Sequence, residues 1–265
     1  MFIRIAAAIA IALPRAFADE AGPQVRELST DRPDKTESPF TVPAGRWQLE
    51  ADAFTFLLDE HGTDAAVART TGWSVAALNL KLGIAERLDL QLILPAWSEQ
   101  EQKFTDGHRE RARGWSDLTI RAKLNLFGND SGGMAMALMP FFSLPTAGGA
   151  FGSDSVEGGL IVPFATKLGG GWNLGAMIEG DVRREDHCST FAGIASVTLS
   201  HDITERLGGY VEWWNEWTRP GWTSTFDAGL TFRITPNVQL DAGANLGLTR
   251  SADDLVVFTG ISIRF

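Results

Sequence analysis

Three consecutive residues, His187-Cys188-Ser189, place a base, a thiol and a hydroxyl next to one another. A nucleophilic serine needs a histidine base within hydrogen-bond reach and a third group that orients this base. No residue of the chain stands out as that third group. The other histidines are dispersed, so they form no metal-ligating cluster with the single cysteine: His61, His108 and His201. No glycine-rich loop follows a strand and opens a helix, which argues against nucleotide binding. We therefore expect no enzyme, no catalytic residue, no metal and no cofactor.

The first residues, the net charge and the cysteine count indicate to which class of protein this chain belongs. The stretch MFIRIAAAIAIALPRAFADE has an early positive charge at Arg4, an apolar run over 5–13 and a small-x-small pattern at 16–18. We predict residues 1–18 as a secretory signal peptide on this pattern. The formal net charge of −10 argues against nucleic-acid binding. A single cysteine, Cys188, excludes an intrachain disulfide framework and is either free or cross-linked to a partner.

Most of the chain after residue 45 alternates between apolar and polar side chains, as a strand with one dry and one wet face does. In WTSTFDAGLTFRI (222–234), for example, the apolar residues occupy every second position almost throughout. The predicted strands are long for soluble sheets and suit a tilted membrane strand. We predict an all-β fold, a closed antiparallel up-and-down transmembrane β-barrel of about twelve strands, at 46–57, 71–84, 87–97, 115–127, 133–145, 157–167, 171–183, 190–202, 206–218, 222–234, 237–249 and 253–265.

The connections between these strands alternate in length. Short turns such as AER, TER and TPN alternate with the longer segments 58–70, 98–114 and 146–156. In outer-membrane barrels the short turns are periplasmic and the long loops are outside, so we expect both termini in the periplasm of a Gram-negative bacterium. Tryptophans fall near the predicted strand ends, as expected of aromatic girdles: Trp47 and Trp172 at the periplasmic end, and Trp73, Trp97, Trp115, Trp217 and Trp222 at the outer end.

The wet faces of the predicted strands carry many charges. Buried charges need water or partners, so they either fill a closed interior with salt bridges or line a water-filled path. A twelve-stranded barrel lies between filled eight-stranded barrels and open porins. The excess of acids predicts a mild preference for cations. The inward candidates are Glu50, Asp52, Lys81, Asp89, Asp117, Arg121, Lys123, Lys167, Glu179, Asp181, Arg183, Glu212, Glu216, Asp227, Arg233, Asp241 and Arg264.

The segment SEQEQKFTDGHRERARG (98–114) is dense in charge. Arg109, Arg111 and Arg113 have three possible roles: contacts to lipopolysaccharide phosphates, an inward constriction, or a solvated exterior loop.

Residues 19–45 form a leader whose prolines and charges oppose helix and strand. Its motif Asp31, Arg32, Pro33 and Asp34 belongs to TDRPD (30–34), which is followed by SP (38–39), VPAG (42–45) and WQLE (47–50). This series resembles the opening of the bacterial family named for a MetA pathway of phenol degradation. The later strings GIAERLDLQL, DLTIRAKLNL and PFFSLPTAG resemble it too. The resemblance implies an outer-membrane barrel, residues 46–265, for uptake of small solutes, aromatic compounds among them, without a catalytic residue.

The position of the leader has two alternatives. It lies loosely in the periplasm, or it inserts into the lumen. In the second case Asp31, Arg32, Asp34 and Lys35 would pair with wall charges such as Arg121, Lys123, Glu179 and Asp181.

The segment DLVVFTGISIRF reads as the last strand, which closes the barrel onto the first. Its final aromatic residue, Phe265, resembles the signal that directs barrels to the outer-membrane assembly machinery. Outer-membrane lipid, lipopolysaccharide, this machinery and a small solute are therefore the expected partners.

We expect an outer-membrane channel for passive uptake of small solutes. A closed structural or assembly barrel is the main alternative. The His187-Cys188-Ser189 triplet also resembles the His-x-Ser element of outer-membrane phospholipase A, but Thr190-Phe191 stands where that family has Asn-Gly. A lipid hydrolase using His187 and Ser189 is therefore the least favoured alternative.

Overall fold

The computed structural model describes residues 26–129, 133–185, 188–219 and 221–265. The predicted signal peptide and His187 lie outside these ranges. Within them, none of the described segments is a helix long and apolar enough to cross a bilayer. The chain forms strands β1 (Trp47–Asp59), β2 (Val67–Val75), β3 (Ala77–Ala85), β4 (Leu88–Leu94), β5 (Trp97–Phe104), β6 (Arg109–Trp115), β7 (Leu118–Phe127), β8 (Met134–Leu144), β9 (Glu157–Gly169), β10 (Trp172–Glu185), β11 (Cys188–Asp202), β12 (Leu207–Trp217), β13 (Trp222–Thr235), β14 (Val238–Gly247) and β15 (Leu255–Arg264).

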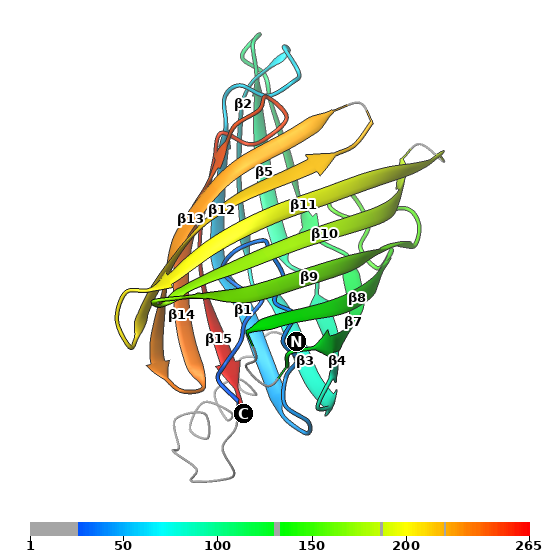
Figure 1. Ribbon diagram of the computed structural model, residues 1–265. Helices are drawn as coiled ribbons and strands as arrows, with labels where there is room; N and C mark the ends of the chain where they lie inside the picture. The colour runs from blue at the N-terminus through cyan, green and yellow to red at the C-terminus, as the bar shows by residue number, and fades with distance from the viewer. Residues whose placement is uncertain (1–25, 130–132, 186–187, 220) are drawn as a thin grey trace.

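These strands close into an antiparallel barrel (Figure 1). Its ring runs from β1 through β3, β4 and β7 to β8, then in chain order to β15, which pairs again with β1. Twelve strands make up this ring, and the predicted closed all-β barrel of about twelve strands is confirmed. At the seam Trp47 and Phe265 exchange two backbone hydrogen bonds of 2.9 Å. Closure gives hydrogen-bond partners to the backbone N–H and C=O groups that an open sheet edge would leave unpaired in hydrocarbon.

The structure corrects the prediction that 58–70 and 98–114 are loops. The ring strands β3, β4 and β7 continue upward past a break into β2, β5 and β6, which extend the same sheet above the ring by pairing with the upper part of β1. We call this end of the barrel the upper end; the start of β1 and the end of β15 lie at the lower end. The breaks occur at Ala76, whose φ is 59°, next to Pro95, which lacks an N–H for the ladder, and at 116–117 between β6 and β7. Periodicity missed these extensions because SEQEQKF is polar on both faces and RERARGW has no large apolar residue opposite its arginines.

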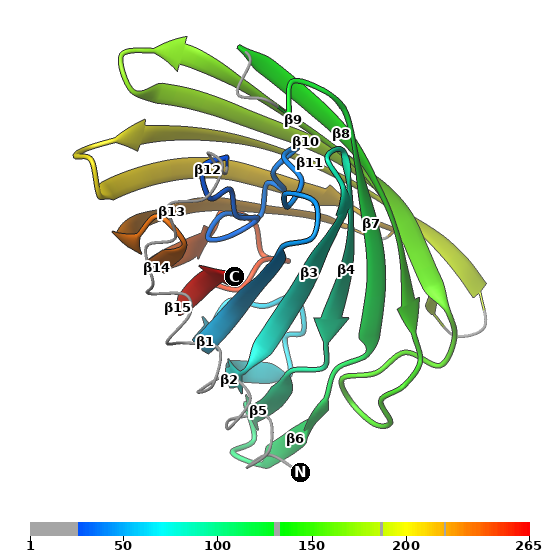
Figure 2. The ribbon, with the colours of Figure 1, turned by 90° about the horizontal axis from the view of Figure 1, so that it is seen from below.

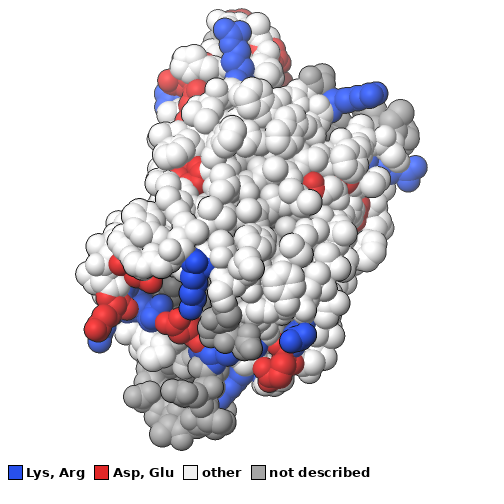
Figure 3. Space-filling view, viewed as in Figure 1, with Lys and Arg blue, Asp and Glu red and all other residues white. Residues whose placement is uncertain are grey.

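The outer face of the ring is apolar. Large hydrophobic side chains on alternate strand positions are exposed, among them Ile178, Phe191 and Leu230. Trp47 and Trp172 are exposed at the lower end, and Trp217 and Trp222 near the upper end. Figure 3 shows a broad zone without charge, with Lys, Arg, Asp and Glu gathered mainly above and below it. This distribution suits a barrel that faces lipid around its middle.

The inner face explains why three predicted strands, 133–145, 157–167 and 206–218, alternate poorly. Met139, Ile161, Met177 and Ile194 form a buried apolar cluster, against which Phe141 and Trp214 pack. These side chains lie on the inner positions of β8 to β12, in line with charged residues such as Glu179 and Glu212. With apolar groups on both faces, such strands lose the period of two. Elsewhere the inner wall is polar.

Candidate functional site: a leader inside the lumen

The leader crosses the inside of the barrel. Figure 2, seen from below, shows the described part of the leader, in blue, as a coil surrounded by the strands. Residues 26–46 form no strand, and Trp47 begins β1. Pro33, Pro39 and Pro43 lack the N–H groups that a regular ladder needs, so this segment uses side chains of the wall as its partners.

Asp31 is the first anchor of the leader. Its carboxylate accepts hydrogen bonds from Lys81 Nζ (2.5 Å) and Lys123 Nζ (2.6 Å), on β3 and β7. Lys81 also contacts Glu50, and the backbone N–H of Asp31 donates to the same glutamate at 3.1 Å. The side chains of Lys81 and Lys123 are only 2% and 1% exposed. Asp31 therefore supplies the negative charge that lets two buried ammonium groups stand close together.

Arg32 is the second anchor, and it contacts β1 and the wall on the other side of β1 from β3 and β7. Its guanidinium contacts Asp52 of β1 and makes a forked interaction with Asp241 of β14, with Nη2–Oδ1 at 2.6 Å and Nε–Oδ2 at 3.3 Å. Such fork-to-fork pairs are directional as well as strong. Gly260 makes room for this side chain, because a Cβ there would lie 2.3 Å from Arg32 Nη2.

The next residues bind the wall through Glu212 of β12. Its carboxylate accepts the backbone N–H groups of Lys35 (2.9 Å) and Thr36 (2.8 Å), and the Thr36 hydroxyl. The ammonium of Lys35 lies 3.2 Å from Asp227 Oδ2 and 4.6 Å from the centroid of the Trp214 ring. The leader is therefore held from several sides of the ring at once.

Neutral wall residues that charge counting missed also hold the leader. Gln48 Nε2 donates to the Ser29 carbonyl (2.8 Å), Asn125 Nδ2 donates to the Pro39 carbonyl (2.9 Å), and Asn129 Oδ1 accepts the N–H of Thr41 (3.0 Å). A signal for two of them was present in the sequence. Gln48 and Asn125 stand two positions from Glu50 and Lys123, so they share the inward face.

Most of the predicted inward charges either hold the leader or pair with one another along the wall. Glu50, Asp52, Lys81, Lys123, Glu212, Asp227 and Asp241 contact the anchors just described, Asp89 accepts the N–H of Val42 (2.9 Å), and Arg121 pairs with Glu37. Asp181 pairs with Arg183 (2.9 Å), which also contacts Glu216, so these three form a wall network instead of holding the leader. For Glu179 the described contacts include no ion pair with the leader.

Other predicted residues lie at the margins of the lumen. Arg233 contacts Glu27 at 3.3 Å near the lower end, Lys167 is exposed there, and Arg264 donates to the Arg26 carbonyl at 2.8 Å. Asp117 accepts the N–H groups of Ala147 and Ser153, so it orders an upper loop instead of lining the lumen. Burial opposes its ionisation, but these backbone hydrogen bonds prevail and lower the pKa of Asp117.

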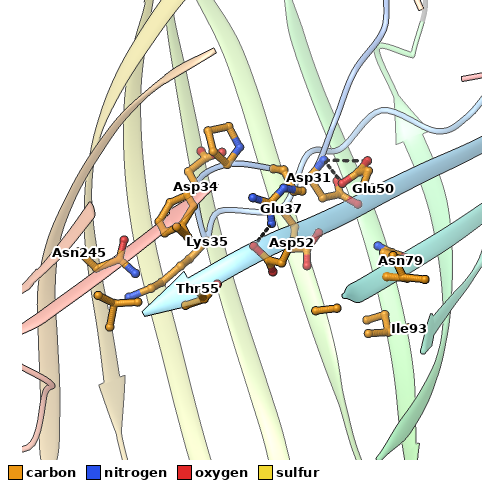
Figure 4. A pocket seen from close by; sticks show the side chains of 16 residues that line it. Asp31, Asp34, Lys35, Glu37, Glu50, Asp52, Thr55, Asn79, Ile93 and Asn245 are labelled. Atoms are coloured by element: carbon orange, nitrogen blue, oxygen red, sulfur yellow. Dashed lines mark hydrogen bonds and ion pairs between the residues drawn. The ribbon is translucent and has the colours of Figure 1, made fainter. Parts of the chain in front are cut away.

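The leader separates two cavities. An upper cavity of about 340 Å³ is lined by Asp52, Thr55, Asn245 and Phe258 among others, and Figure 4 shows the leader residues Asp34, Lys35 and Glu37 beside it. A lower cavity of about 260 Å³ is lined by Asn173, His201, Tyr210 and other residues of the lower half. The same leader residues line both: Arg32, Pro33, Asp34 and Glu37. A thin segment of leader thus stands between the two spaces.

The model of the family "Putative MetA-pathway of phenol degradation" matches residues 30–265, which covers the leader motif and the whole barrel. The chain belongs to this family. The resemblance seen in TDRPD and the later strings is thereby confirmed. No curated protein matches the chain in sequence.

Solved structures similar to this family member are outer-membrane barrels. The transport unit of the autotransporter AIDA-I from Escherichia coli has a TM-score of 0.56 at 9% identity, covering 98% of this chain and 96% of that one. The β-domain of the Bordetella autotransporter BrkA has a TM-score of 0.53 at 13% identity, with coverage of 84% and 100%. The NanC porin has a TM-score of 0.51 at 9% identity, with coverage of 81% and 98%. At such identities the likeness shows the fold, that of an outer-membrane β-barrel.

Proposed function

We propose that this barrel is an outer-membrane channel through which small solutes diffuse, and that its leader sets the width of the path. The observation that carries this proposal is the pair of cavities above and below the leader, which share the leader residues Arg32, Pro33, Asp34 and Glu37 as their common lining. A segment held by side-chain contacts can shift between positions at far lower cost than a strand of the closed ring, whose backbone is paired on both sides. The leader is therefore the natural place for the path to open.

In this proposal the lower end, with its short turns, faces the periplasm and the extended upper end faces outward. The solutes are small, and aromatic compounds are the first class to test because the family is named for phenol degradation. Phe258 in the upper cavity offers an apolar surface to such a ring.

Swelling of proteoliposomes tests the passage of solutes. Vesicles that contain the barrel are expected to swell in small amino acids, small sugars and benzoate-like acids, and to swell more slowly as the solute grows. Empty vesicles and vesicles with a closed eight-stranded barrel are the controls. No swelling with any solute would favour the alternative, a closed structural barrel. Phospholipid turnover that is lost in Ser189→Ala would instead favour a hydrolase.

The channel is expected to prefer cations. The upper cavity is lined by five acids, namely Asp31, Asp34, Glu37, Glu50 and Asp52, against two bases, Arg32 and Lys35. Lys81, Lys123 and Arg121 of the wall pair with Asp31, Glu50 and Glu37, so Asp34 and Asp52 are the acids of this lining on which the preference mainly rests. Reversal potentials in a KCl gradient across a planar bilayer measure this preference, which should weaken as salt screens the lining. Asp34→Asn should reduce it, whereas Glu60→Gln, outside the lumen, should leave it unchanged. A preference for anions would refute the expectation.

A further inference from the structure

A row of cations crosses the upper extension. Arg69 of β2 stands opposite Lys103 of β5, and Lys103 stands opposite Arg109 of β6. Arg111 and Arg113 follow on β6 at every second position, facing Glu101 and Glu99. We call these five bases the basic face. Figure 3 shows Lys and Arg together with Asp and Glu at this upper end, above the uncharged zone. The basic face stands out on a chain whose formal net charge is −10.

The basic face points away from the lumen. Trp73 is 37% exposed and stands opposite Glu99, which stands opposite Arg113, so these side chains share one face of the extension. The other face is turned inward, where a Cβ at Gly114 would meet Phe151 of an upper loop at 3.6 Å. Each step of two residues along β6 rises by roughly 7 Å. The bases therefore begin at the level of Trp73 and continue above it.

The bases are only partly neutralised. Glu101 accepts Arg109 (2.8 Å) and Arg111 (2.5 Å), and Glu60 lies 3.5 Å from Arg69. The side chains of Arg109 and Arg111 nevertheless remain 56% and 68% exposed. Like charges directly opposite on neighbouring strands destabilise a sheet. Charges of either sign would protect the edge of β6 from pairing with another chain, so edge protection does not explain why its outward charges are all arginines.

We propose that the basic face binds the phosphate groups of lipopolysaccharide in the outer leaflet. Planar guanidinium groups match phosphate oxygens bidentately, which suits arginine at alternate positions. The height of the face agrees, because an aromatic residue such as Trp73 sits at the membrane interface and the phosphorylated headgroups lie just beyond the apolar layer. This surface is separate from the lumen, so the proposal that it binds lipopolysaccharide does not depend on whether the barrel conducts solutes.

The test is retention of lipid A by the purified barrel in detergent, measured by native mass spectrometry. Bisphosphorylated lipid A and the same lipid with its phosphates removed are added in parallel. The unmodified barrel is expected to retain the phosphorylated lipid about tenfold more strongly, since several exposed charge contacts act together. This arm needs no substitution, so it remains informative if a variant fails to fold.

The matched variants are Lys103→Gln/Arg109→Gln/Arg111→Gln and, as control, Arg250→Gln, an exposed arginine of the upper end outside the basic face. The triple variant should lose most of the preference for phosphorylated lipid A, and the control should keep it. Equal retention of both lipids by the unmodified barrel, or an unchanged preference in a folded triple variant, would overturn the proposal.

Discussion

Removal of residues 28–40 is expected to raise the single-channel conductance of the barrel severalfold. This segment carries Asp31, Arg32 and Thr36, which span the lumen between β1, β3, β7, β12 and β14. Without it the two cavities would join, and the wall charges left behind would be solvated by the water that enters. Conductance in planar bilayers at 1 M KCl measures the effect directly. A deleted channel that conducts no more than the full chain would contradict the role of the leader.

A point substitution provides a finer version of this test. Arg32→Ala removes the pair with Asp52 and Asp241 and should cost about 3 kcal/mol of leader docking, because Asp241 stays buried without its cation. More frequent openings at unchanged maximal conductance are expected. Glu27→Gln, whose carboxylate meets Arg233 at the exposed lower rim, is the matched control and should behave like the unmodified barrel. An Arg32→Ala channel with unaltered gating would place the restriction elsewhere.

Phe265→Ala is expected to lower the amount of folded barrel in the outer membrane. The side chain of Phe265 packs on the buried pair Val238 and Ile263 beside the seam, and its backbone closes the ladder with Trp47. Loss of this half-buried aromatic side chain removes about 1–2 kcal/mol of hydrophobic stabilisation at the seam, where the first and last strands must pair. We further propose that the assembly machinery reads this aromatic residue. Heat-modifiable mobility on gels, combined with membrane fractionation, reports the folded fraction.

Phe232→Ala serves as the comparison for this effect. Phe232 is a lipid-facing aromatic residue of the lower half, but it lies on β13, between two ordinary ladder neighbours and away from the seam. Its loss should reduce folded protein much less than the loss of Phe265. Equal losses from the two substitutions would mean that aromatic area alone matters, and not the position at closure.

Much of the fold was readable from the chain because a membrane barrel imposes a simple rule. Each strand must face lipid on one side and the lumen on the other. Apolar and polar residues therefore alternate with a period of two in segments such as 222–234 and 237–249. The alternation is absent or weak in two kinds of strand. Inner apolar residues such as Met139 and Ile161 blurred the alternation of β8 and β9, and the extensions β5 and β6 stand outside hydrocarbon, where neither face needs to be apolar.

The leader marks the limit of local reasoning. Its prolines and charges sufficed to exclude strand and helix, and its motif pointed to a family. Arg121 and Lys123 were among the wall charges expected to meet an inserted leader, and both do. The specific pairs were beyond reach, because Asp31 meets Lys81 and Lys123 across 50 and 92 residues, and Arg32 meets Asp241 across 209. Strand periodicity is a property of neighbouring residues and can be read from the chain. Which charges face one another inside a closed ring depends on the order and stagger of all its strands, and so is decided only when the barrel closes.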